Sequence, residues 1–361
     1  MLILVALIMT FGVPLYANTK EPLNVLHLSF HKGCLSDFKT VAKELNLNLT
    51  SWWIHEDNNR FEGRPFAGGD VYNINPRRAE RVWKKNKDFF DSFDVIITSD
   101  TAPLARIFLQ NNWNKPLIIW VCNRFDYAAG NGKEMPFPDP AYYQLMKNAL
   151  KKQNVRIISY TPYEYIYAQR KGIPFPAQTI KPIGKQPSAK IIESTVPTSI
   201  DKKNSFLIFP RLEPRNMHSA ISECQKRNIP IWAGKYNGPE DLKDFKGVIF
   251  FPYAYSNIAL FENIQRGVIH FVPTQRFILQ LGYIWDATLR ANLNWCEWYQ
   301  EEYQNAFVFF DSWDDLKTKL EMTNYKQLKA KILELGKYHR DTTLAEWQKL
   351  FSDITQQVAY I

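Results

Sequence analysis

Short apolar runs alternate with helix-like segments along most of this chain, and the alternation stops once before it resumes. Strands that are almost continuously apolar are typical of a parallel sheet covered by helices on both faces. The predicted strands of the first half are residues 23–30, 49–54, 93–98, 117–122 and 155–159, and those of the second half are 206–209, 230–234, 248–251 and 268–272. The pattern predicts an α/β fold with two Rossmann-like domains.

The interruption is a proline-rich stretch, residues 173–204, that we interpret as the linker between the two domains. The expected division is a first domain at 21–185, a second at 186–345, and a C-terminal helix at 346–361 that packs back on the body. In a parallel α/β sheet, ligands bind beyond the carboxyl ends of the strands. Two such domains are therefore expected to face each other across a cleft that holds the site.

The N-terminus carries an apolar run, residues 2–13, that is shorter than the about 20 residues of a membrane span. It is typical of a signal peptide or a short membrane anchor within residues 1–20, although it lacks a basic start. The alternative is a first buried strand. We expect the secretory pathway lumen, the periplasm or a membrane-anchored location, with the cytoplasmic face less favoured.

The net charge of +9 suits anionic ligands, although a solvated basic surface explains it equally well. Basic side chains gather on one predicted helix, residues 77–91. The ordinary interpretation is a helix face exposed to solvent, and the more specific alternative is peripheral contact with a membrane surface. Clustered basic and aromatic motifs are absent from the sequence, so no nucleic-acid partner is expected.

Several familiar site motifs are missing from the sequence. The four cysteines form no CxxC pair, so a zinc site is not expected. Neither a phosphate-binding P-loop, a GxSxG elbow, an HExxH helix nor a glycine-rich dinucleotide motif is present. The expected site holds no metal and no cofactor.

In the second half, residues 248–274 hold a strand, a polar turn with Tyr253, a helix and another strand. Ser256 or Asn257 is expected to cap the helix and to leave N–H groups aimed at the cleft, where an anion can bind. Glu262 lies further along this helix, and its carboxylate could accept hydrogen bonds from a ribose diol. The alternative is an ordinary αβ unit with a solvated glutamate.

The stretch ALFENIQRGVIHFVPT, preceded by IFFPYAYS, resembles the nucleotide-sugar segment of GT-B glycosyltransferases. The resemblance implies that Glu262 binds the donor ribose and that Ser256 and Asn257 lie by the diphosphate. It also implies that Arg211 and Lys235 neutralise phosphate charge. The chain departs from the paired glutamates of many retaining members, since Tyr255 stands seven residues before Glu262, which leaves the stereochemical course open.

Three residues after strands of the first half are candidates for activating an acceptor hydroxyl. His31 titrates near neutral pH and could act as a general base, as could the carboxylates of Asp100 and Asp126. Each has a structural alternative. His31 could be a loop histidine bonded to the backbone, and the two aspartates could cap helices or stabilise turns.

The expected function is a metal-independent glycosyltransferase that moves a sugar from a nucleotide-sugar donor to a hydroxyl of a glycan or glycoconjugate. The rival is a secreted two-lobed solute-binding protein without catalysis. Connectivity separates them, because such binding proteins cross between their lobes several times, whereas this chain is expected to complete one lobe before the other.

Overall fold

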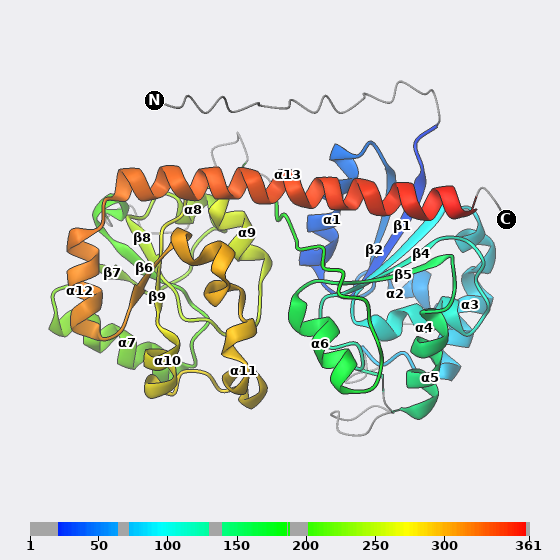
Figure 1. The fold of residues 1–361 in the computed structure, drawn as a ribbon, viewed down its shortest axis with the longest axis horizontal. Helices are drawn as coiled ribbons and strands as arrows, with labels where there is room; N and C mark the ends of the chain where they lie inside the picture. Colours follow the sequence, from blue (N-terminus) through cyan, green and yellow to red (C-terminus); the bar gives the residue numbers. More distant parts are fainter. Residues whose placement is uncertain (1–20, 64–71, 130–138, 186, 188–200, 359–361) are drawn as a thin grey trace, which may run out of the picture.

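The computed structural model describes residues 21–63, 72–129, 139–185, 187 and 201–358. It consists of two α/β lobes side by side, with a long C-terminal helix lying along both (Figure 1). Residues 1–20 fall outside the described ranges, so the signal peptide or anchor stays a prediction. Within those ranges, no helix combines the length and apolar character needed to cross a membrane.

The first lobe is a five-stranded parallel sheet in the order β2-β1-β3-β4-β5. Its strands are β1 (Asn24–Ser29), β2 (Asn48–Trp53), β3 (Val95–Asp100), β4 (Leu117–Val121) and β5 (Val155–Ser159). Its helices are α1 (Lys32–Glu44), α2 (Asn58–Phe61), α3 (Pro76–Asp91), the 3-10 turn η1 (Ala102–Ala105), α4 (Arg106–Leu109), α5 (Pro140–Ala149) and α6 (Pro162–Arg170).

The second lobe is a five-stranded parallel sheet in the order β10-β9-β8-β6-β7. Its strands are β6 (Phe206–Ile208), β7 (Ile231–Trp232), β8 (Gly247–Ile249), β9 (His270–Pro273) and β10 (Phe307–Phe310). Its helices are α7 (Pro214–Lys226), α8 (Pro239–Leu242), α9 (Ile258–Ile264), α10 (Gln275–Leu281), α11 (Ala287–Ala291) and α12 (Trp313–Met322), with 3-10 turns at η2 (Lys202–Asn204), η3 (Leu293–Trp295), η4 (Glu297–Tyr299) and η5 (Glu301–Ala306).

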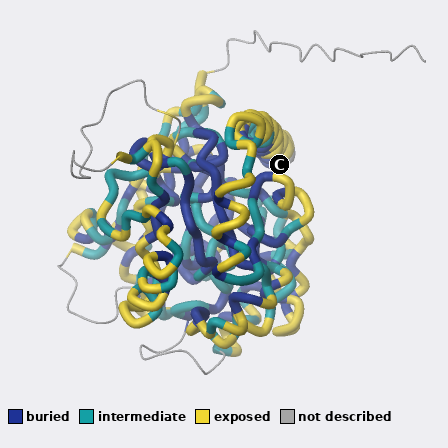
Figure 2. Tube along the Cα trace, turned by 90° about the vertical axis from the view of Figure 1, so that its left-hand side faces the viewer, coloured by how far each residue is buried: buried dark blue, intermediate teal, exposed yellow. Residues whose placement is uncertain are grey.

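The α/β fold and the two parallel sheets expected from the sequence are confirmed, and each sheet takes its strands from one continuous part of the chain. The strands form the buried centre of each lobe, and the helices carry the exposed surface (Figure 2). Strand β10 was not expected from the sequence. It pairs with β9 in parallel and completes the second sheet.

Two helix boundaries differ from the expected ones. Helix α1 begins at Lys32 rather than near residue 36, because the His31 side chain caps it. The C-terminal helix α13 (Tyr325–Val358) begins well before residue 346. Its first part packs on the second lobe through Ile332, and its last part packs on the first lobe through Trp347 and Ile354. One uninterrupted helix therefore joins the two lobes, and it contacts the linker, where the Nε2 of His339 lies 2.8 Å from the carbonyl oxygen of Pro182.

Candidate functional site

Both sheets have the same strand order, because β7-β6-β8-β9-β10 repeats β2-β1-β3-β4-β5. In a sheet of this order, the strands that come first and third in the chain lie side by side, and their connections run to opposite sides of the sheet. Ligands bind in the crevice between the carboxyl ends of these two strands. In the first lobe this crevice lies between β1 and β3. His31 follows β1, and Asp100 is the last residue of β3. In the second lobe it lies between β6 and β8, which precede Arg211 and Tyr253.

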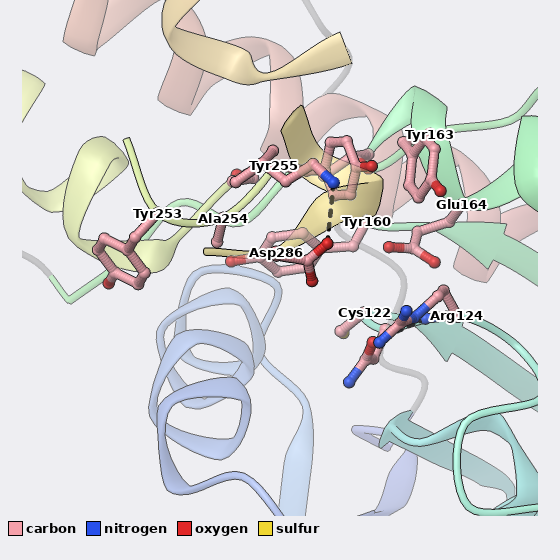
Figure 3. A pocket seen from close by; sticks show the side chains of 13 residues that line it. Cys122, Arg124, Tyr160, Tyr163, Glu164, Tyr253, Ala254, Tyr255 and Asp286 are labelled. Atoms are coloured by element: carbon pink, nitrogen blue, oxygen red, sulfur yellow. Dashed lines mark hydrogen bonds between the residues drawn. The ribbon is translucent and has the colours of Figure 1, made fainter. Parts of the chain in front are cut away.

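A cavity between the lobes lies next to these crevices (Figure 3). The first lobe lines it with residues 122–124 after β4 and with Tyr160, Thr161, Tyr163 and Glu164 after β5. The second lobe lines it with residues 253–256 after β8, Asp286 and Leu289. The rings of Tyr163 and Tyr255 stack across the two lobes, with their centroids 3.8 Å apart. The expectation of a cleft between facing lobes is confirmed.

Asp100 ends β3 with a backbone φ of 72°, in the left-handed region that few residues other than glycine adopt. Strained backbone of this kind gathers at functional sites. Burial and the nearby Cys34 together raise the pKa of Asp100 to about 7, against the opposing effect of His31. A carboxylate with this pKa can accept a proton from a substrate hydroxyl near neutral pH.

His31 is exposed and caps α1, and its Nδ1 accepts a hydrogen bond from the Cys34 N–H at 3.3 Å. This contact is the structural alternative for His31, a loop histidine bonded to the backbone. Its Nδ1 also lies 3.6 Å from the Cys34 Sγ. The hydrogen bond with Cys34 raises the pKa of His31, burial opposes this, and the charges of Cys34 and Asp100 add to the rise. The arrangement favours Asp100 over His31 as the base.

Two thiols lie behind His31. A hydrogen bond from Cys122 lowers the pKa of Cys34 to about 6, against the opposing effect of burial. Burial in turn raises the pKa of Cys122 well above its ordinary value. Cys34 is buried and does not line the cavity, so its contribution here is to tune the charge of His31 and Asp100.

Asp126 is placed differently from the sequence prediction. It is buried, and its carboxylate accepts hydrogen bonds from the hydroxyls of Tyr143, at 2.5 Å, and Tyr167, at 3.1 Å. It does not line the cavity. A carboxylate held by two phenols behind the cavity wall positions the 123–127 turn, and it is not available to a substrate hydroxyl.

In the second lobe, Arg211 and Tyr253 are neighbours, and both come from the ends of central strands. Burial raises the pKa of Tyr253, while the charge of Arg211 and hydrogen bonds with Asn257 and Arg211 oppose the rise. Tyr236, which the sequence analysis did not single out, lies close to both side chains, and burial raises its pKa to about 12. Lys235 is exposed nearby after β7, where its carbonyl accepts the Trp232 indole N–H.

The polar turn before α9 differs from the expected anion site. Asn257 caps the helix as predicted, and its side chain accepts the Leu260 N–H at 2.9 Å. The helix has only 7 residues, so its dipole is small and one of its few open donors is already taken. Ser256 lines the cavity, and its hydroxyl is buried without a partner there. The anion site at the start of α9 stays a prediction, and Arg211 beside Tyr253 is a second source of positive charge in this lobe.

Glu262 lies between the lobes but does not line the cavity. Its Oε1 accepts the backbone N–H of Lys185 at 3.0 Å, which ties Glu262 to the linker, and the expected ribose contact stays a prediction. Asp37 of α1 accepts the N–H of Gly184, Gln265 donates to the carbonyl of Ile183, and Arg266 donates to that of Lys185. Side chains of α1, of α9 and of the turn after α9 thus hold the linker backbone where the chain leaves the first lobe.

Gly184 is the tightest point of this contact, and we expect Gly184→Ala to destabilise the protein by about 2–4 kcal/mol. Its φ is 70°, and a Cβ there would lie 2.4 Å from the Glu262 Cγ and 3.0 Å from the Glu262 backbone nitrogen. Urea unfolding measures the change. Gly172→Ala is the matched control, because Gly172 has a φ of 76° with nothing within 4 Å of its Cβ position. Equal losses in both variants would contradict a steric role of the linker contact.

The basic residues of α3 are largely engaged within the protein. Arg78 is buried against Glu62, Lys84 pairs with Glu80 and Lys87 pairs with Asp91. These contacts favour the solvated-face interpretation, and membrane contact stays a prediction. Within the described residues, no cluster of three or more His, Cys, Asp or Glu side chains is arranged to hold a metal ion.

Glu164 and Arg124 are cavity residues that the sequence analysis did not name as candidates. Glu164 lies in the first turn of α6, directly after β5, so the rule that ligands bind beyond strand ends could have found it. In Figure 3 both side chains reach the cavity from the first lobe, opposite Tyr253 and Tyr255.

No family model and no curated protein matches the chain. Several solved glycosyltransferase structures have a similar fold. They include SnogD from Streptomyces nogalater, at 9% identity over 91% of this chain and 99% of that one, with a TM-score of 0.48. They also include a ugt transferase from Siraitia grosvenorii in complex with UDP, at 9% identity over 92% and 100%, with a TM-score of 0.49. Similarity at this level leaves the functional argument to the residues of the chain itself.

Proposed function

We propose that this protein is a glycosyltransferase that moves a sugar from a nucleotide-sugar donor to an acceptor hydroxyl. The observation that carries the proposal is an interlobe cavity bordered by strand ends of both lobes, with Cys122 after β4 and Tyr253 after β8 in its lining. Asp100 and Arg211 lie in the strand-end crevices beside this cavity and not in its lining. One crevice offers Asp100, a carboxylate suited to proton transfer, and the other offers Arg211 beside Tyr253, a cation and a hydroxyl suited to a phosphate.

In the proposed reaction, the acceptor oxygen bonds to the anomeric carbon of the donor sugar while the bond from that carbon to the diphosphate breaks. Asp100 takes the proton of the attacking hydroxyl, and Arg211 balances the charge that develops on the leaving diphosphate. The lobes bring both substrates together, which removes much of the entropic cost of their encounter. We propose that the transfer needs no metal, so it should persist with a chelator present.

The rival, a two-lobed solute-binding protein, is less well supported. Strands β1–β5 all precede the linker and β6–β10 all follow it, so the sheets are built one after the other. That connectivity is the one expected of the transferase.

Arg211→Ala is expected to weaken the binding of a nucleoside diphosphate about 10–100-fold, because a hydrogen bond to a charged group contributes about 1.5–3 kcal/mol. Calorimetric titration with UDP, GDP and CMP measures the affinity of the whole chain. Arg215→Ala is the control, because Arg215 is equally exposed and lies at the start of α7. The proposal fails if the unaltered protein binds none of the three nucleotides.

A further inference from the structure

Four buried oxygens around the interlobe cavity have no hydrogen-bond partner among the described residues. They are Oγ1 of Thr161, Oε2 of Glu164, the hydroxyl of Tyr255 and Oγ of Ser256. The exposed fraction is 2% for Thr161 and 5% for Glu164. Burying a polar group without a partner costs on the order of 1–3 kcal/mol, so such groups are rare unless a ligand or water completes them. Their concentration at one cavity indicates a binding site.

The side chains around these oxygens indicate what kind of molecule fits. Three hydroxyls and a carboxyl offer both donors and acceptors, while the half-buried rings of Tyr253 and Tyr255 offer apolar surface. Arg124 and Asp286 carry opposite charges, so the lining does not favour an ion of either sign. A sugar ring, with hydroxyls at its edge and C–H groups on its faces, matches both parts of this lining.

Glu164 is suited to a neutral ligand because it is itself neutral near pH 7. Burial raises the pKa of Glu164 to about 8, with Asp126 adding to the rise and Arg124 opposing it. Across the cavity, Asp286 uses its Oδ1 to accept the N–H groups of Thr288 and Leu289. A neutral carboxyl can donate a hydrogen bond to a sugar oxygen, which an ionised one cannot.

The cavity also adjoins the candidate base. Asp100 is paired in the first sheet with Val121, and the next residue, Cys122, lines the cavity. Asp100 does not itself line the cavity, so a ring beside Cys122 lies next to the end of β3 rather than against the Asp100 carboxylate. This closeness to the candidate base makes an acceptor the ligand that fits the proposed reaction.

Building on the glycosyltransferase function proposed above, we propose that the acceptor is itself a sugar residue, that it binds in this cavity, and that the Glu164 carboxyl selects it by donating a hydrogen bond. Glu164 is a specificity residue in this scheme, and Asp100 remains the base.

The test measures binding of two probe sets to the full chain by saturation-transfer NMR. One set contains methyl glycosides of hexoses, deoxyhexoses and pentoses, and the other contains sugar-free phenols. We expect at least one methyl glycoside to bind and the phenols not to. Glu164→Ala should weaken that binding at least 10-fold, and Glu164→Gln, which keeps a neutral donor, should stay within 3-fold at pH 6.5. Glu334→Gln, exposed on α13, is the matched control.

The pH dependence separates a binding role from a structural one. Affinity of the unaltered protein for the glycoside should fall above pH 8, as Glu164 ionises, and the affinity of Glu164→Gln should not. Because Glu164→Gln is nearly isosteric, this comparison holds even if Glu164→Ala does not fold. Phenol binding without glycoside binding, or equal affinity in Glu164→Ala, would overturn the inference.

The two proposals can fail separately. If nucleotides bind through Arg211 but no glycoside binds, the acceptor inference is wrong and the glycosyltransferase proposal stands. If glycosides bind through Glu164 but no nucleotide binds, the glycosyltransferase proposal is wrong, the acceptor inference falls with it, and the sugar-binding cavity belongs to the rival solute-binding protein.

Discussion

Asp100→Asn should lower the rate of sugar transfer by a factor of about 10²–10⁴ while leaving the fold intact, because general-base catalysis contributes that much. Asparagine is among the few residues that tolerate the left-handed region, so the backbone at a φ of 72° is preserved. The amide removes only the ability to take the proton. Release of nucleoside diphosphate from the bound donor, in the presence of acceptor, measures the rate.

The pH profile strengthens this test. A base works in its ionised form, and the pKa of Asp100 is raised to about 7, so kcat/KM of the unaltered enzyme should fall as the pH drops below about 7. In Asp100→Asn, kcat/KM should not show this fall below pH 7. Asp94→Asn is the control, since Asp94 precedes the same strand at the other end and accepts the Asn24 N–H. If Asp100→Asn retains normal turnover, the proton must go to His31 or to another group.

Trp347→Ala should lower the free energy of unfolding by about 3–5 kcal/mol, the usual cost of removing a large buried aromatic side chain. Trp347 is fully buried on α13. Its ring packs edge-on against Phe38 of α1 and Trp120 of β4, with centroids 5.1 Å and 5.3 Å away. The substitution leaves a cavity where the C-terminal helix meets the first lobe. Urea unfolding followed by circular dichroism measures the loss.

Tyr338→Ala on the same helix is the comparison, because Tyr338 is 68% exposed and should change stability by less than about 0.5 kcal/mol. A loss below about 1 kcal/mol for Trp347→Ala would mean that α13 does not depend on the first lobe. In that case the two lobes would be held together by the other contacts between them, among them the linker contacts of Gly184 and Glu262 and the stack of Tyr163 on Tyr255.

The positions of several candidate residues followed from local sequence. His31, Asp100 and Arg211 were predicted after apolar runs, and the structure places them at the ends of β1, β3 and β6. Apolar runs bounded by polar turns specify strands, and parallel strands bring their carboxyl ends to one edge of the sheet. Proximity to that edge can therefore be predicted without knowing the packing.

The direction in which a side chain points depended on distant partners. Asp126 turns toward tyrosines that lie 17 and 41 residues later in the chain, and Glu262 turns toward the linker, 77 residues earlier. The sequence around Asp126 or Glu262 contains no pattern that identifies these distant partners. The same is true of Glu164, whose raised pKa comes from burial by the packed lobes.

By itself, the sequence determined two α/β lobes in chain order and the strand ends that carry candidate chemistry, because apolar periodicity and turn residues act over short distances. Tertiary structure alone decided that β10 completes the second sheet, that α13 spans both lobes, and that Glu164 rather than Asp126 reaches the cavity. Those outcomes depend on which surfaces are buried against each other, and burial between segments far apart in the chain has no local pattern.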